Sequence, residues 1–203
     1  MDNEYAGETT EIKPAGWPKP IGVLSLVFGI LAVTCGVAGT GLSFFSESFA
    51  QTMSFGQLPP ATPPFPMMPS ASPLFIASGV LGVIVNIVLI VAGIRLLKRQ
   101  QQGRTLHLAY ALLGVLAAFV GTYAGYVGQQ DLLASQAAWA EQYGEASDYG
   151  KQIAAQVDMQ QQFAGTSQAV GSIIGLAGWL AWPVFCIIWF GMAKKVVPPA
   201  YGN

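Results

Sequence analysis

The chain has 203 residues, of which 53% are hydrophobic and only 9% are charged, whereas a soluble globular chain carries roughly 25% charged residues. Its formal net charge is -1, so the sequence offers no overall attraction to nucleic acid or to an acidic surface. This composition excludes an ordinary soluble domain and is typical of an integral membrane protein.

Residues 1–20 form an acidic, polar segment that lacks the basic and then apolar pattern of a signal peptide. Behind it the chain has stretches that are long and apolar enough to cross a bilayer, which takes about 20 residues of helix. They are residues 21–45, 74–97, 105–126 and 170–192. We therefore expect an all-α protein, an integral membrane four-helix bundle over residues 21–192 with a tail at 193–203.

The two long segments between the spans differ in kind. Residues 46–73 hold seven of the thirteen prolines and are predicted to form an irregular loop. Residues 127–169 lack proline and are rich in Ala, Gln and Glu, which predicts that spans three and four extend into an extracytoplasmic helical hairpin with its turn near residues 144–150. Pairing of its two halves would bury four apolar side chains, which are also the candidate residues for a partner surface: Leu132, Trp139, Ile153 and Val157.

The basic residues predict the topology, because Lys and Arg in short loops concentrate on the cytoplasmic side. Of the nine Lys and Arg residues, Lys151 alone lies in a segment expected outside. Both tails and the connector between spans two and three should therefore be cytoplasmic. The residues that carry most of this prediction are Arg95, Lys98, Arg99, Arg104, Lys194 and Lys195.

Small residues at four-residue spacing predict close helix packing within the membrane, because lipid supplies no hydrophobic force between helices. These residues are Gly121, Gly125, Gly171, Gly175, Ser25 and Gly29. Asn86 is the strongly polar residue near the middle of a span, and we expect it to face another helix and to form an interhelical hydrogen bond. An alternative is that Asn86 lines a pore. His107, near the end of span three, is expected to contact lipid headgroups.

The sequence offers no catalytic motif, no metal-ligand cluster and no cofactor motif, and we expect a protein that is not an enzyme. Cys35 and Cys186 lie at different depths in spans one and four and are expected to be free. The segment Pro198–Tyr201 matches the P-P-x-Y ligand of WW domains, but the alternative, a proline stop followed by a loose tail, is favoured.

The layout of four spans, a short cytoplasmic connector and a larger second outer segment resembles that of claudins and tetraspanins. The resemblance covers hydropathy only, since the outer-loop cysteines of those families are missing, and we favour a protein of the bacterial inner (plasma) membrane. The expected function is a scaffold or accessory subunit of a larger membrane assembly, with a membrane-protein partner or a homo-oligomer. The alternative is an oligomeric channel or small-solute permeation protein built around Asn86.

Overall fold

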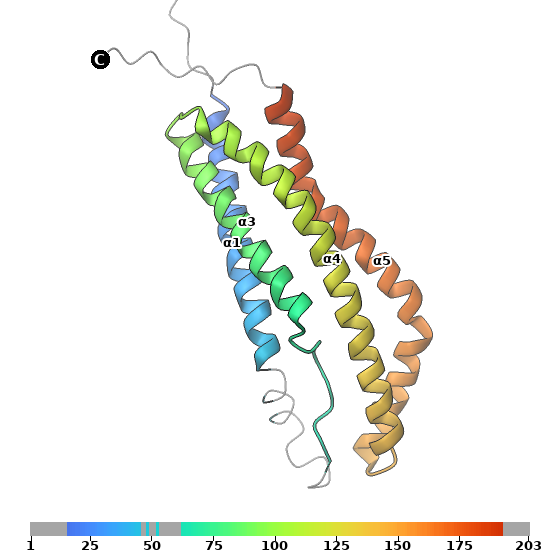
Figure 1. The fold of residues 1–203 in the computed structure, drawn as a ribbon. Coiled ribbons are helices and arrows are strands. Elements are labelled where there is room, and N and C mark those ends of the chain that lie inside the picture. Colours follow the sequence, from blue (N-terminus) through green and yellow to red (C-terminus); the bar gives the residue numbers. More distant parts are fainter. Residues whose placement is uncertain (1–15, 46–47, 49–51, 53–61, 193–203) are drawn as a thin grey trace, which may run out of the picture.

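The computed structural model describes residues 16–45, 48, 52 and 62–192. Over these residues the chain is helical without strands, and its long helices are α1 (Pro18–Phe44), α3 (Pro73–Leu97), α4 (Gln102–Tyr143) and α5 (Asp148–Met192) (Figure 1). The prediction of an all-α protein is confirmed.

Each of these helices is long and apolar enough to cross a membrane, judged by length and composition. Their starts follow local sequence rules. Pro18 and Pro73 stand in the first turns of α1 and α3, where a missing amide hydrogen costs nothing. The hydroxyl of Ser72 caps α3 by accepting a 3.2 Å hydrogen bond from the amide of Phe75. Large aliphatic side chains are exposed along all four helices, as expected of helices whose solvent is lipid.

Helices that follow one another in the chain pack together: α1 on α3, α3 on α4, and α4 on α5. The α1–α3 contact is close because glycines line it. A Cβ added at Gly93 would lie 2.9 Å from the carbonyl oxygen of Gly22, and one added at Gly29 would lie 2.6 Å from Ile90 Cγ1. Ser25 and Gly29, two of the predicted packing residues, thus lie on the face of α1 that meets its neighbours.

The connector between α3 and α4 is a tight turn built around a left-handed residue. Arg99 has φ 56°, the amide of Arg99 donates to Leu96 O, and the amide of Gln100 donates to Arg95 O, which together form a Schellman ending for α3. Gly103 then passes so close that an added Cβ would lie 2.8 Å from the backbone nitrogen of Leu96. Position 103 therefore has no room for a residue larger than glycine unless the backbone shifts.

α4 and α5 are continuous helices of 42 and 45 residues joined by a short turn. The turn closes with a hydrogen bond from the amide of Gly150 to the hydroxyl of Ser147. The two helices run past the ends of α1 and α3 as a pair (Figure 1). α4 and α5 are aligned so that all four apolar residues predicted to be buried in the hairpin are buried: Leu132, Trp139, Ile153 and Val157.

Candidate functional site

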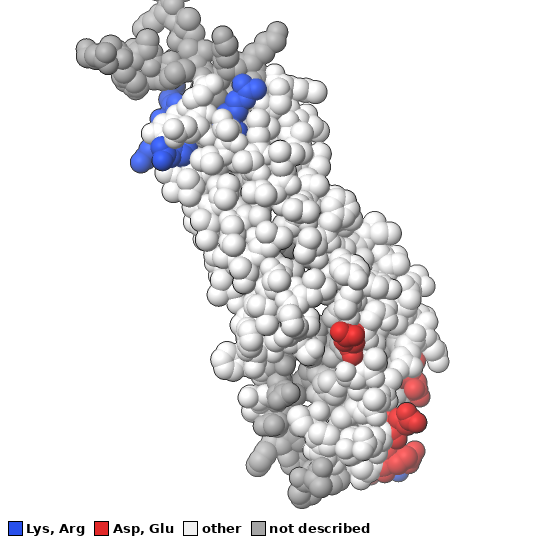
Figure 2. All heavy atoms as spheres, in the orientation of Figure 1, with Lys and Arg blue, Asp and Glu red and all other residues white. Residues whose placement is uncertain are grey.

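Charge is separated along the molecule. Figure 2 shows most of the described Lys and Arg side chains gathered at the end where α3 meets α4, and the Asp and Glu side chains toward the opposite end, where Lys151 also lies beside Asp148. Arg95, Lys98, Arg99 and Arg104 belong to the basic end, whereas Lys194 and Lys195 lie outside the described residues. Arg104 Nε donates a 2.9 Å hydrogen bond to the carbonyl oxygen of Phe190, one of the last carbonyls of α5. A cation suits this position because helix C-termini carry partial negative charge.

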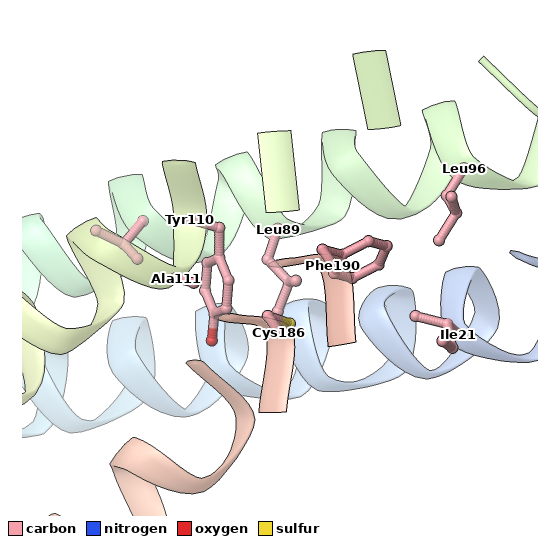
Figure 3. Close-up of a cluster of buried hydrophobic side chains, with 8 residues drawn as sticks. Ile21, Leu89, Leu96, Tyr110, Ala111, Cys186 and Phe190 are labelled. Carbon is pink, nitrogen blue, oxygen red and sulfur yellow. The ribbon is translucent and has the colours of Figure 1, made fainter. Parts of the chain in front are cut away.

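Next to the basic end the bundle is filled by side chains. Residues of all four helices meet in one core cluster, drawn in Figure 3: Ile21, Val85, Leu89, Leu96, Tyr110, Ala111, Cys186 and Phe190. Aromatic contacts add to it, with the ring centroids of Trp17 and Phe190 5.9 Å apart. At that end of the described bundle, side chains of all four helices therefore pack against one another.

His107 lies inside this packed region, and the expectation of a headgroup contact is wrong. The side chain is fully buried and stacks on Phe190, with ring centroids 4.5 Å apart. Its Nδ1 lies 2.6 Å from the carbonyl oxygen of Gly103, and its Nε2 lies 2.8 Å from Ser25 Oγ. A carbonyl can only accept, so Nδ1 carries a proton. Ser25 lies 82 positions away in the sequence, which is why no local pattern reveals this pairing.

Asn86 is buried and lines a cavity of about 250 Å³ that begins where the core cluster ends. The amide Nδ2 donates a 2.8 Å hydrogen bond to the carbonyl oxygen of Gly82, which is on the same helix. The expected interhelical bond is therefore replaced by a bond within α3. Tyr110 belongs both to the cavity wall and to the cluster, so packed side chains form the floor of the cavity.

The remaining predicted packing glycines make no close contacts with the part of the chain that the structure describes. An added Cβ at Gly121, Gly125, Gly171 or Gly175 would have no non-local atom within 4 Å. All four line a cleft of about 430 Å³ between α4 and α5. Small residues here leave space between the two helices, in contrast to the glycines between α1 and α3.

The proline-rich segment packs on the hairpin, which sequence reasoning did not foresee. Trp139 Nε1 donates a 2.9 Å hydrogen bond to Pro63 O, and Gln136 Nε2 donates one of the same length to Pro66 O. Phe65 meets Trp139 edge to face, with centroids 5.2 Å apart. The prolines themselves indicate such a contact. Backbone carbonyls in a proline-rich stretch lack helical partners and need donors from elsewhere in the chain.

This packing corrects the expected partner surface. Leu132, Trp139, Ile153 and Val157 are each exposed by less than a tenth, since the two helices and the proline-rich segment cover them. They hold the hairpin together and are not accessible to a partner. Exposed apolar side chains on this part of α5 are instead Met159 and Phe163, each 63% exposed.

Within the described ranges no three His, Cys, Asp or Glu side chains gather in a way that could hold a metal ion. Cys35 is exposed, Cys186 is buried, and both are free thiols. Comparisons with protein families, with curated proteins and with solved structures find no match for this chain.

Proposed function

We propose that this protein is a non-enzymatic tetraspan membrane protein that serves as a scaffold or accessory subunit of a larger membrane assembly. We place it in the bacterial inner membrane with its basic end in the cytoplasm, following the distribution of Lys and Arg. The observation that carries the proposal is the α4–α5 hairpin, which extends past α1 and α3 and has a small core of its own.

The exposed surface of the hairpin suits contact with another protein. Met159 and Phe163 are four positions apart, so they lie on the same face of α5, and the exposed Gln162 flanks them, whereas Gln161 points to the other side of the helix. Exposed apolar side chains within a polar surface are typical of an interaction site. The arrangement supports a partner that docks along α5 rather than at the buried residues between the helices.

A deletion tests the proposal. Gln130 Nε2 donates a 2.7 Å hydrogen bond to Gln168 Oε1, so the two helices are already close at that level. Removing residues 132–163 and joining the ends by a short flexible loop should leave the four spans inserted. We expect the shortened protein to lose the partner that co-purifies with the full chain from native membranes.

A surface variant makes the test sharper. Met159→Ser combined with Phe163→Ser should lose the same partner with an unchanged melting temperature, while Gln161→Ser is the control on the same helix and should keep it. Retention of the partner by both the deletion and the double variant would contradict a role of the hairpin in assembly. The exposed faces of the spans would then be the better candidates.

The permeation alternative has one observation in its favour, the cavity at Asn86. Val85 and Tyr110 belong both to the cavity lining and to the packed cluster, so a path from the cavity toward the basic end would have to pass that cluster. Reconstituted protein decides between the alternatives. Solute or ion flux that Asn86→Leu abolishes without lowering stability would favour a channel over a scaffold.

A further inference from the structure

The cavity at Asn86 and the cleft between α4 and α5 adjoin one another. Gly121, Thr122 and Trp179 line both spaces, so one ligand could reach from the polar hairpin side into the bundle interior. We propose that this joined space binds one molecule of an amphiphile, with its apolar chain in the cavity and an uncharged, hydrogen-bonding head group in the cleft.

The polarity of the two linings differs in the way such a ligand requires. Around the cavity, small and apolar side chains dominate, among them Ala32, Val83, Val85 and Ala117. Around the cleft, hydrogen-bonding side chains gather on the hairpin side: Gln129, Gln160, Ser167, Gln168 and Ser172. The volumes of about 250 and 430 Å³ together fall in the range of roughly 300–1,000 Å³ that small-molecule sites occupy.

The linings also indicate that the head group is neutral. Neither space is lined by Lys, Arg, Asp or Glu. A charged head would meet no side chain of opposite charge in either lining, whereas amides and hydroxyls can both donate to and accept from a neutral polar head. Lys151, the described cation of the hairpin, is 3.8 Å from the carboxylate of Asp148. A glycerol or sugar head fits these donors and acceptors better than a phosphate or a carboxylate.

Gly121 is one of the residues that line both spaces. A Cβ added there would meet no non-local atom within 4 Å, so the backbone leaves room for a larger residue, whose side chain would take up space that both linings share. Gly178 on α5 supplies a matched control, because its added Cβ also meets nothing within 4 Å and the residue lines neither space. If Gly121→Leu weakens binding and Gly178→Leu does not, the effect comes from the proposed site and not from the loss of a glycine in a helix.

The test uses the purified full-length chain and monooleoylglycerol as the probe, with bound molecules counted by native mass spectrometry. We expect one molecule per wild-type chain, retention in Gly178→Leu, and at least about tenfold weaker binding in Gly121→Leu. Equal binding by Gly121→Leu and Gly178→Leu would overturn the proposed site.

A second comparison tests the head group and does not depend on the folding of the first variant. Gln160→Leu should weaken binding about three- to tenfold, as expected for one lost hydrogen bond, while Gln161→Leu, at a residue that lines neither space, should not. Lysophosphatidylglycerol and oleate carry the same chain with an anionic head and should bind at least about tenfold more weakly than monooleoylglycerol. Tighter binding of either anion, or no effect of Gln160→Leu, would overturn the assignment of a neutral head.

Discussion

The indole nitrogen of Trp139 donates a 2.9 Å hydrogen bond to the carbonyl oxygen of Pro63, joining α4 to a segment 76 positions earlier in the chain. Trp139 is 5% exposed and also contacts Phe65 and Tyr143. One side chain thus contributes to the hairpin core and fixes the proline-rich segment against it. The end of the molecule that holds the α4–α5 turn is therefore built from three segments, α4, α5 and the proline-rich segment, rather than from two helices.

The first prediction tests this joining role. Trp139→Phe keeps an aromatic ring next to Phe65 but removes the N–H donor, and we expect a loss of about 1 kcal/mol in the free energy of unfolding. Hydrogen exchange should rise in residues 62–72 more than in the helices. The exposed Trp179→Phe is the control and should change neither quantity. Unchanged exchange at 62–72 would show that the Trp139 bond does not hold the segment.

The second prediction concerns the buried pair Ser25 and His107. Ser25→Ala leaves Nε2 of the imidazole without its partner from α1, and we expect the unfolding free energy in detergent to fall by about 1 kcal/mol, the usual scale for such bonds in membrane proteins. A double-mutant cycle with His107→Leu should give a coupling energy of similar size. Strict additivity of the two changes would mean that the pair does not stabilise the bundle.

The third prediction concerns the left-handed residue of the connector. Arg99 has φ 56°, a conformation that costs a residue with a Cβ roughly 1 kcal/mol more than glycine. Arg99→Gly should therefore raise the melting temperature. Lys98→Gly is the matched control, because Lys98 has φ -77° and gains nothing from glycine. A lower melting temperature for Arg99→Gly than for Lys98→Gly would indicate that the Arg99 side chain, and not its backbone, decides stability.

The helices were predictable because their signals are local. Apolar length predicts α1 and α3, and a proline-free, Ala- and Gln-rich stretch predicts that α4 and α5 continue through the hairpin. The helical spacing of Leu132, Trp139, Ile153 and Val157 also predicts that they are buried together.

The predictions that were wrong concern contacts between distant parts of the chain. The burial of His107 requires Ser25 and Phe190, which belong to other helices. Glycine spacing alone could not distinguish Gly29, which meets Ile90, from Gly121, which lines an open space. The same spacing permits both close contact and a cleft, and only the positions of neighbouring helices decide between them.

The last prediction is the topology, which the separation of charge makes testable at both ends of one molecule. Gln101 is exposed in the connector beside Lys98, Arg99 and Arg104, and Glu145 is exposed at the turn of the hairpin.

Because basic residues near span ends are retained in the cytoplasm, a cysteine at Gln101 should react with an impermeant thiol reagent only after the membrane is opened. A cysteine at Glu145 should react in intact cells. Both variants are made in a Cys35→Ser background, since Cys35 is an exposed free thiol and would add background, whereas Cys186 is fully buried in the core cluster. Each variant is thus the control for the other, and labelling of Gln101→Cys but not Glu145→Cys from outside would invert the proposed orientation. That result would put the hairpin and its Met159–Phe163 surface in the cytoplasm, where its partner would then have to be sought.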